Sequence, residues 1–248
     1  MNLIGMFAKY LIDMNYFGRF FLTTILLIKI YCMSFAQTDN SIGNWNGIII
    51  KGKMSQRLSL MTESHIRTGH YNLKYDYFEI KSGISYSITK NIHGLIGAGF
   101  YNTYQTGALF QTPARQKEFR TWFELNYFHS YNRFNFEQRV RIEQSFIPDN
   151  YKNRLKYRLL LQIPINKKEL IKGSIYFLVN DELFMPQYGL WVEKNRFYSG
   201  VGYKLNSNTN WQIGCVSDTD YKSNSHSIQN YLQILLIYDF ANFIKKHT

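Results

Sequence analysis

The feature that most constrains this chain is a strict alternation of apolar and polar residues over long segments. It is clearest over residues 134–146, where one face is apolar apart from Gln138 and Gln144, and the other is mostly charged. A period of two is that of a β-strand, whose successive side chains point to opposite faces. A slip of one residue would exchange the two faces, so the pattern also fixes the register.

The same alternation predicts eleven visible strands. They cover residues 45–53, 58–67, 77–88, 92–103, 118–130, 134–146, 154–164, 170–183, 196–205, 210–217 and 229–240. Several are as long as the 9 to 11 residues of a tilted membrane strand, whereas globular strands average about 5–6 residues. We therefore predict an all-β protein, a transmembrane antiparallel up-and-down β-barrel.

The connections between these strands alternate in length. Short turns are expected near residues 55–56, 89–91, 131–133, 166–168 and 206–209, and longer loops at 68–74, 104–117, 147–153, 184–195 and 218–228. This alternation is typical of outer-membrane barrels, which normally have an even number of strands. Eleven strands would begin and end on opposite rims, so we expect about twelve strands, or ten, with residues 37–44 as the place for a further strand.

The N-terminal segment predicts export. Lys9 and Arg19 precede the apolar run 20–28, and Ser34-Phe35-Ala36 supplies small residues for cleavage. We expect residues 1–36 to be a cleaved signal peptide of the general secretory route and residues 37–248 to form the barrel. Cleavage would leave Cys215 as the only cysteine, which excludes an internal disulfide.

Which face points inward is decided by three observations. Aromatic residues recur at the ends of the apolar faces, as in Phe119 and Tyr127, and the polar faces carry charges of both signs. The last strand, 229–240, ends in an apolar and aromatic face that resembles the C-terminal signal of the barrel-assembly machinery. We therefore expect apolar faces on lipid and polar faces on the lumen. The alternative is a soluble barrel filled by its apolar faces.

These expectations imply partners and a location. The apolar exterior would contact outer-membrane lipid and lipopolysaccharide, and strand 229–240 would bind the assembly machinery of a Gram-negative bacterium. The formal net charge of +12 could suggest nucleic acid, but the basic residues alternate along strands and form no tail. We therefore expect no nucleic-acid partner.

The chain also resembles an uncharacterised family of Gram-negative outer-membrane barrels, known only as a domain of unknown function. The similarity spans residues 45 to 240. It is carried by Trp45 and by the segments 136–143 (FEQRVRIE), 153–158 (NRLKYR) and 195–203 (NRFYSGVGY). The resemblance implies a barrel fold and an outer-membrane location, and it supplies no activity and no catalytic residue.

The candidate site is a cluster of charges on the predicted lumen face. Its members are Arg120, Glu124, Glu137, Arg139, Arg141, Glu143, Arg154, Lys156, Arg158, Glu182 and Arg196. One interpretation is a salt-bridge network that closes the lumen and makes a structural or interaction barrel, because buried charges must be paired. The other is a constriction in a narrow channel that favours small anionic solutes, because basic residues are in excess.

Catalysis and cofactors have weaker support. An outer-membrane lipid hydrolase would need a nucleophile beside a base, and His129 and Ser130 are adjacent residues whose side chains point to opposite faces of a strand. The remaining histidines are scattered, and Asp218-Thr219-Asp220 lies in an expected outer loop that could touch calcium or lipopolysaccharide. We expect no catalytic residue, no cofactor and no metal site.

Overall fold

The computed structural model describes residues 42–69, 75–105, 110–111 and 113–240. These residues form eleven strands and no helix that is long and apolar enough to cross a membrane. The predicted signal peptide, residues 1–36, lies outside the described residues. The strands are β1 (Gly43–Lys53), β2 (Leu58–Thr68), β3 (Tyr77–Ser87), β4 (Ile92–Thr103), β5 (Gln116–Tyr131), β6 (Phe134–Ile147), β7 (Asn150–Pro164), β8 (Ile175–Pro186), β9 (Lys194–Lys204), β10 (Thr209–Lys222) and β11 (Ser225–Phe240).

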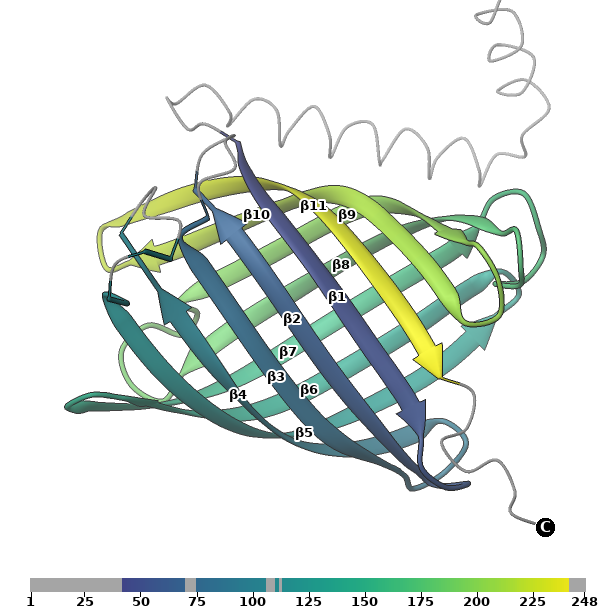
Figure 1. Ribbon diagram of the computed structural model, residues 1–248, viewed down its shortest axis with the longest axis horizontal. Coiled ribbons are helices and arrows are strands. Elements are labelled where there is room, and N and C mark those ends of the chain that lie inside the picture. Colours follow the sequence, from purple (N-terminus) through teal and green to yellow (C-terminus); the bar gives the residue numbers. More distant parts are fainter. Residues whose placement is uncertain (1–41, 70–74, 106–109, 112, 241–248) are drawn as a thin grey trace, which may run out of the picture. The chain divides into compact units, whose positions relative to one another are not determined.

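The strands close into one barrel (Figure 1). Each strand pairs antiparallel with the next, and the barrel closes where β1 and β11 run side by side in the same direction, with Gly43 opposite Tyr231 and Gly52 opposite Phe240. The expected all-β barrel is confirmed, and ten of its eleven strand pairs are antiparallel; the count is eleven instead of about twelve, or ten, and the closing pair is parallel. An odd number of hairpin-connected strands brings the first and last strands together in parallel, and this pair satisfies both edges without a further strand. We call the mouth where β1 begins the N-terminal rim and the mouth where β11 ends the C-terminal rim.

The apolar faces of the strands point out of the barrel, and the charged faces point in. Ile142 is 55% exposed and Leu159 is 39% exposed, whereas Arg141, next to Ile142 on β6, is 5% exposed. The alternative of a barrel filled by its apolar faces is therefore wrong.

Aromatic side chains form a band on the outer surface near each rim. Near the N-terminal rim, ring centroids lie 5.1 Å apart for Phe100 and Phe119, 6.1 Å for Phe119 and Phe146, and 5.3 Å for Phe146 and Tyr151. The band near the C-terminal rim includes Tyr127, His129, Phe134, Phe136, Tyr238 and Phe240. Exposed aliphatic residues such as Ile96, Val140 and Ile142 lie between the bands.

Three predicted connections differ from the structure. The expected loops at 147–153 and 218–228 are two-residue turns, because β6, β7, β10 and β11 continue past the predicted strand ends into long hairpins. Asp149 has a φ of 60°, a left-handed conformation that aspartate tolerates, so Pro148-Asp149 alone reverses the chain. The reverse error occurs at 166–168, where the expected short turn is a connection of residues 165–174 and β8 begins only at Ile175.

Two inward-facing glycines let aromatic rings lie flat against the barrel wall. A Cβ on Gly97 would lie 2.3 Å from Cζ2 of Trp122, and a Cβ on Gly202 would lie 2.0 Å from Cζ of Tyr176. Any larger residue would push these rings toward the barrel axis. The glycines thus leave room in the lumen beside the candidate site.

Candidate functional site in the barrel lumen

All eleven residues of the predicted cluster lie on inward-facing positions of β5 to β9, and each takes part in at least one ion pair. The pairs join neighbouring strands and also strands further apart around the barrel. We call this set, with the partners described below, the lumen charge belt.

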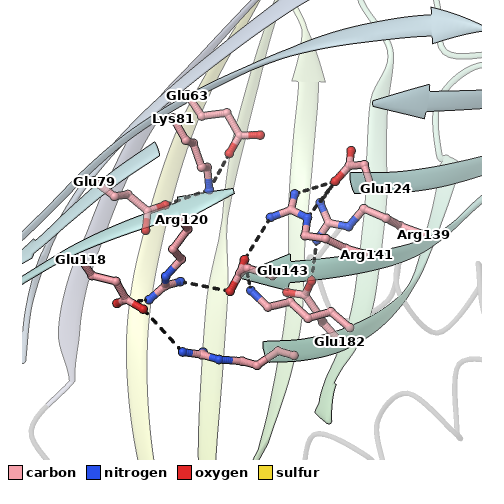
Figure 2. Close-up of polar contacts among 12 residues, drawn as sticks. Glu63, Glu79, Lys81, Glu118, Arg120, Glu124, Arg139, Arg141, Glu143 and Glu182 are labelled. Atoms are coloured by element: carbon pink, nitrogen blue, oxygen red, sulfur yellow. Dashed lines mark hydrogen bonds and ion pairs between the residues drawn. The ribbon is translucent and has the colours of Figure 1, made fainter. Parts of the chain in front are cut away.

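Glu143 lies at the centre of the belt (Figure 2). Its side chain is 1% exposed. Its carboxylate accepts a hydrogen bond from Lys156 Nζ at 2.6 Å and lies 3.6 Å from Arg120 Nη1 and 3.8 Å from Arg141 Nη1. One buried anion therefore holds three cations from three different strands.

Glu124 and Glu182 form a second centre with two arginines. Arg141 donates to Glu124 from Nε at 2.8 Å and approaches it through Nη2 at 2.7 Å. Arg139 donates to Glu182 at 2.5 Å and lies 3.9 Å from Glu124 (Figure 2). Such charge-assisted bonds are roughly twice as strong as neutral ones, and they fix the guanidinium planes in the lumen.

The remaining members of the predicted cluster lie on either side. Arg158 donates to Glu137. Arg196 donates to Asp218 through Nε at 2.6 Å and through Nη2 at 2.8 Å, which is the bidentate geometry that arginine offers to a carboxylate. Arg154 lies 3.7 Å from Glu118 and 3.2 Å from Glu193.

Several partners in the belt were not predicted. Lys81 on β3 lies 2.8 Å from Glu63 and 2.9 Å from Glu79, and Arg120 donates to Glu118 at 2.6 Å (Figure 2). The alternation on residues 58–67 and 77–88 would place Glu63, Glu79 and Lys81 on the inner face, which is the signal that could have found them. Asp218 was assigned to an outer loop, and it is a buried residue of β10.

Several lumen arginines also contact aromatic rings, and two of them, Arg67 and Arg196, both pair with Asp218 and both contact Trp45. The guanidinium carbon of Arg67 lies 4.5 Å from the ring centroid of Trp45 and 3.7 Å from that of Tyr77. The guanidinium carbon of Arg196 lies 4.6 Å from the centroid of Trp45. Trp45 is therefore held between two cations, an arrangement that stabilises both arginines in a buried position.

A cavity of about 570 Å³ lies inside the barrel. Its wall carries twelve basic residues against six acidic ones. The basic residues are Lys51, Arg67, Lys81, Arg120, Arg139, Arg141, Arg154, Lys156, Arg158, Lys194, Arg196 and Lys204, and the acidic residues are Glu63, Glu79, Glu118, Glu137, Glu182 and Asp239. Glu124, Glu143 and Asp218 are not part of this wall, so much of the compensating negative charge lies behind the cations.

The two residues considered for catalysis, His129 and Ser130, lie outside the lumen charge belt. His129 stacks on Phe136 with ring centroids 4.7 Å apart, and Ser130 donates to Asn135 Oδ1 at 2.8 Å. The two side chains lie on opposite faces of β5, as predicted. Among the described residues, no group of three or more His, Cys, Asp or Glu side chains could hold a metal ion.

Comparison with known proteins identifies a family but no individual related protein. The family model described as "Protein of unknown function (DUF2490)" matches residues 42–229, which includes β1 to β10 and part of β11. No curated protein and no solved structure matches the chain.

Proposed function

The chain belongs to the DUF2490 family, whose function is unknown, and from the geometry of its barrel we propose an outer-membrane protein whose narrow lumen admits small anionic solutes. The observation that carries this proposal is the twofold excess of basic over acidic residues on the cavity wall. Rings of arginine and lysine give anion selectivity in other pores.

The outer surface supports a membrane location. Every strand has at least 11 residues, which is enough to cross a bilayer at a tilt. Phe119 and Tyr127 mark the two aromatic bands on β5, eight residues apart, which is about 27 Å along the strand and about 20 Å across a membrane at a tilt of about 40°. An apolar exterior between two aromatic bands is the outer surface that lipid requires.

Fractionation of a Gram-negative host tests this location. We expect the mature protein in the outer-membrane fraction, with an electrophoretic mobility that changes on heating, as a folded barrel in detergent shows. Recovery of the protein in the soluble periplasmic fraction would contradict a membrane barrel.

Planar bilayers test the passage of anions. Purified barrel is placed in a bilayer between two KCl solutions that differ tenfold in concentration. We expect discrete current steps and a reversal potential closer to the equilibrium potential of chloride than to that of potassium. Lys51 lines the cavity and Lys117 points outward from β5. We expect Lys51→Glu to move the reversal potential toward that of potassium, and the matched Lys117→Glu to leave it unchanged.

A structural barrel with a closed lumen is the second candidate. The specific observation in its favour is that every carboxylate of the belt's centre is already paired and buried. Eleven strands also lie between the eight of a filled barrel and the sixteen or more of an aqueous porin. A barrel that inserts into the bilayer without steady current would establish this second candidate, and cation selectivity would contradict the first.

A further inference from the structure

The half of the lumen nearer the C-terminal rim carries several apolar side chains on its wall. On β7, Leu160 follows Lys156 and Arg158 at the next inward position toward this rim, and on β8, Leu178 precedes Glu182. Ile49 on β1 and Ile237 on β11 occupy corresponding inward positions, and all four side chains line the cavity. These four side chains form an apolar strip beside polar wall residues of the same half, among them Lys51, Lys204 and Asp239.

The connection of residues 165–174 extends this wall. Leu170 is half-buried, lines the same cavity and packs, with Leu160, against a cluster that contains Tyr176 and Leu178. The connection is held in place by Ser174, whose hydroxyl donates to the carbonyl of Glu169 at 2.8 Å. We call Ile49, Leu160, Leu170, Leu178, Leu235 and Ile237 the inner apolar wall.

The passage of small ions does not require apolar side chains on the lumen wall. The interiors of membrane barrels are usually polar, and apolar area facing water costs about 25 cal/mol per Å². Ile49, Leu160 and Ile237 are only half-buried and face the cavity. An apolar group in the cavity would remove this area from water.

Two arginines face the same cavity next to these apolar side chains. Arg139 and Arg158 line it, and among the described residues the buried Nε atom of each has no hydrogen-bond partner. Each guanidinium therefore keeps one donor for a further anionic oxygen while its other nitrogens hold Glu182 and Glu137.

We propose that the lumen binds a single acyl chain with an anionic head group, with the head at Arg139 and Arg158 and the chain along the inner apolar wall. This names the substrate class of the proposed function and rests on it, because the lumen must admit an anion. The head group is a carboxylate if the ligand is a free fatty acid, and a phosphate monoester if the ligand is derived from a phospholipid.

Photoaffinity labelling in nanodiscs tests the site, because the alternation of side chains distinguishes a ligand in the lumen from one in the surrounding lipid. A decanoate with a diazirine at the chain end is cross-linked to the purified, full mature barrel, and the adducts are mapped by mass spectrometry. We expect adducts on the inward Leu160 and Ile237 that excess decanoate competes away. Adducts confined to the outward Leu159, Leu161 and Leu236 would overturn the proposal.

Two variants and two head groups sharpen the test. We expect Leu160→Gln to reduce the competed lumen adducts about tenfold, because it removes apolar contact worth about 1–2 kcal/mol, and Arg139→Gln to reduce them severalfold. The matched outward variant Leu159→Gln should leave them unchanged, and heat-modifiable mobility checks that each variant is folded. The same chain with a trimethylammonium head should give no lumen adduct; lumen labelling that ignores the head charge would overturn the role of the arginines.

The phosphate monoester arm identifies the source of the ligand. Stronger labelling by the carboxylate supports a free fatty acid, and stronger labelling by the phosphate supports a lipid-derived head. If planar bilayers show current but no lumen adduct is lost on adding excess decanoate, this inference is overturned and the proposed passage of small anions stands. If excess decanoate removes lumen adducts but planar bilayers show no current, the proposed passage of anions is overturned and the acyl-chain site stands.

Discussion

Replacing Glu143 by glutamine tests whether the lumen charge belt stabilises the barrel. The substitution keeps the shape of the side chain and one acceptor for Lys156, and it removes the negative charge that Lys156, Arg120 and Arg141 share within 3.8 Å. Breaking a buried ion pair by removing one partner typically costs 3–5 kcal/mol. Since the amide still accepts a hydrogen bond, we expect Glu143→Gln to lower the free energy of unfolding by about 3 kcal/mol.

The matched variants separate this charge effect from a general loss of packing. Lys156→Met leaves Glu143 with two arginines, so it should cost only about 1 kcal/mol. In the double variant Glu143→Gln/Lys156→Met one excess cation is removed, and we expect a loss of about 2 kcal/mol, which is a coupling of about 2 kcal/mol between the sites.

The assay is equilibrium unfolding by urea in lipid vesicles, followed by tryptophan fluorescence and by electrophoretic mobility without heating. A Glu143→Gln barrel within about 0.5 kcal/mol of the wild type, together with no coupling to Lys156, would refute this reasoning. The belt would then be hydrated enough for water to screen its charges.

Three further predictions use other parts of the barrel. Gly97→Ala should cost about 1–3 kcal/mol of unfolding free energy, because the added methyl group meets Trp122, whereas Gly94→Ala on the outward face of the same strand has no contact closer than 3.6 Å and should be tolerated; equal losses in urea unfolding would contradict this. Val140→Arg, midway between the aromatic bands, should cost about 2–4 kcal/mol in vesicles and Tyr151→Arg near the rim at most about 1 kcal/mol, and equal costs would argue against lipid on this face. Mass spectrometry of protein extracted from the envelope should give a mature chain that begins at Gln37, and a chain that begins at Ala36 or earlier would contradict the predicted cleavage site.

The sequence predicted the direction of the charges because the alternation is local. Arg139 and Arg141 are separated by one apolar residue, so any strand through 134–146 places both on one face, and β6 differs from the predicted segment by one residue. All eleven predicted strands are present for the same reason. The parallel pairing of β1 with β11 could not be predicted from the alternation within each strand, because it depends on how the first and last strands of the sheet meet.

The contacts within the belt depend on information that alternation does not contain. Arg139 and Glu182 are 43 positions apart in the sequence, and their contact at 2.5 Å follows from the register of β6, β7 and β8 and from the curvature of the barrel. Asp218 was missed because the polar residues that follow it suggested a loop. Pairing with β9 extends β10 through Asp218 to Asp220, and pairing with β11 extends it to Lys222. Polar residues at the end of a long hairpin resemble a loop when only their composition is read.

The parallel pairing of β1 and β11 has a consequence for any fusion protein. The polypeptide enters the barrel wall at Gly43 and leaves it at Phe240, on opposite mouths, so a short linker between the two ends would have to cross the full height of the wall. Circular permutation through a short linker, which suits barrels whose ends meet, is therefore excluded by geometry. In a bilayer, an epitope placed before β1 would be displayed on one side of the membrane and an epitope placed after β11 on the other.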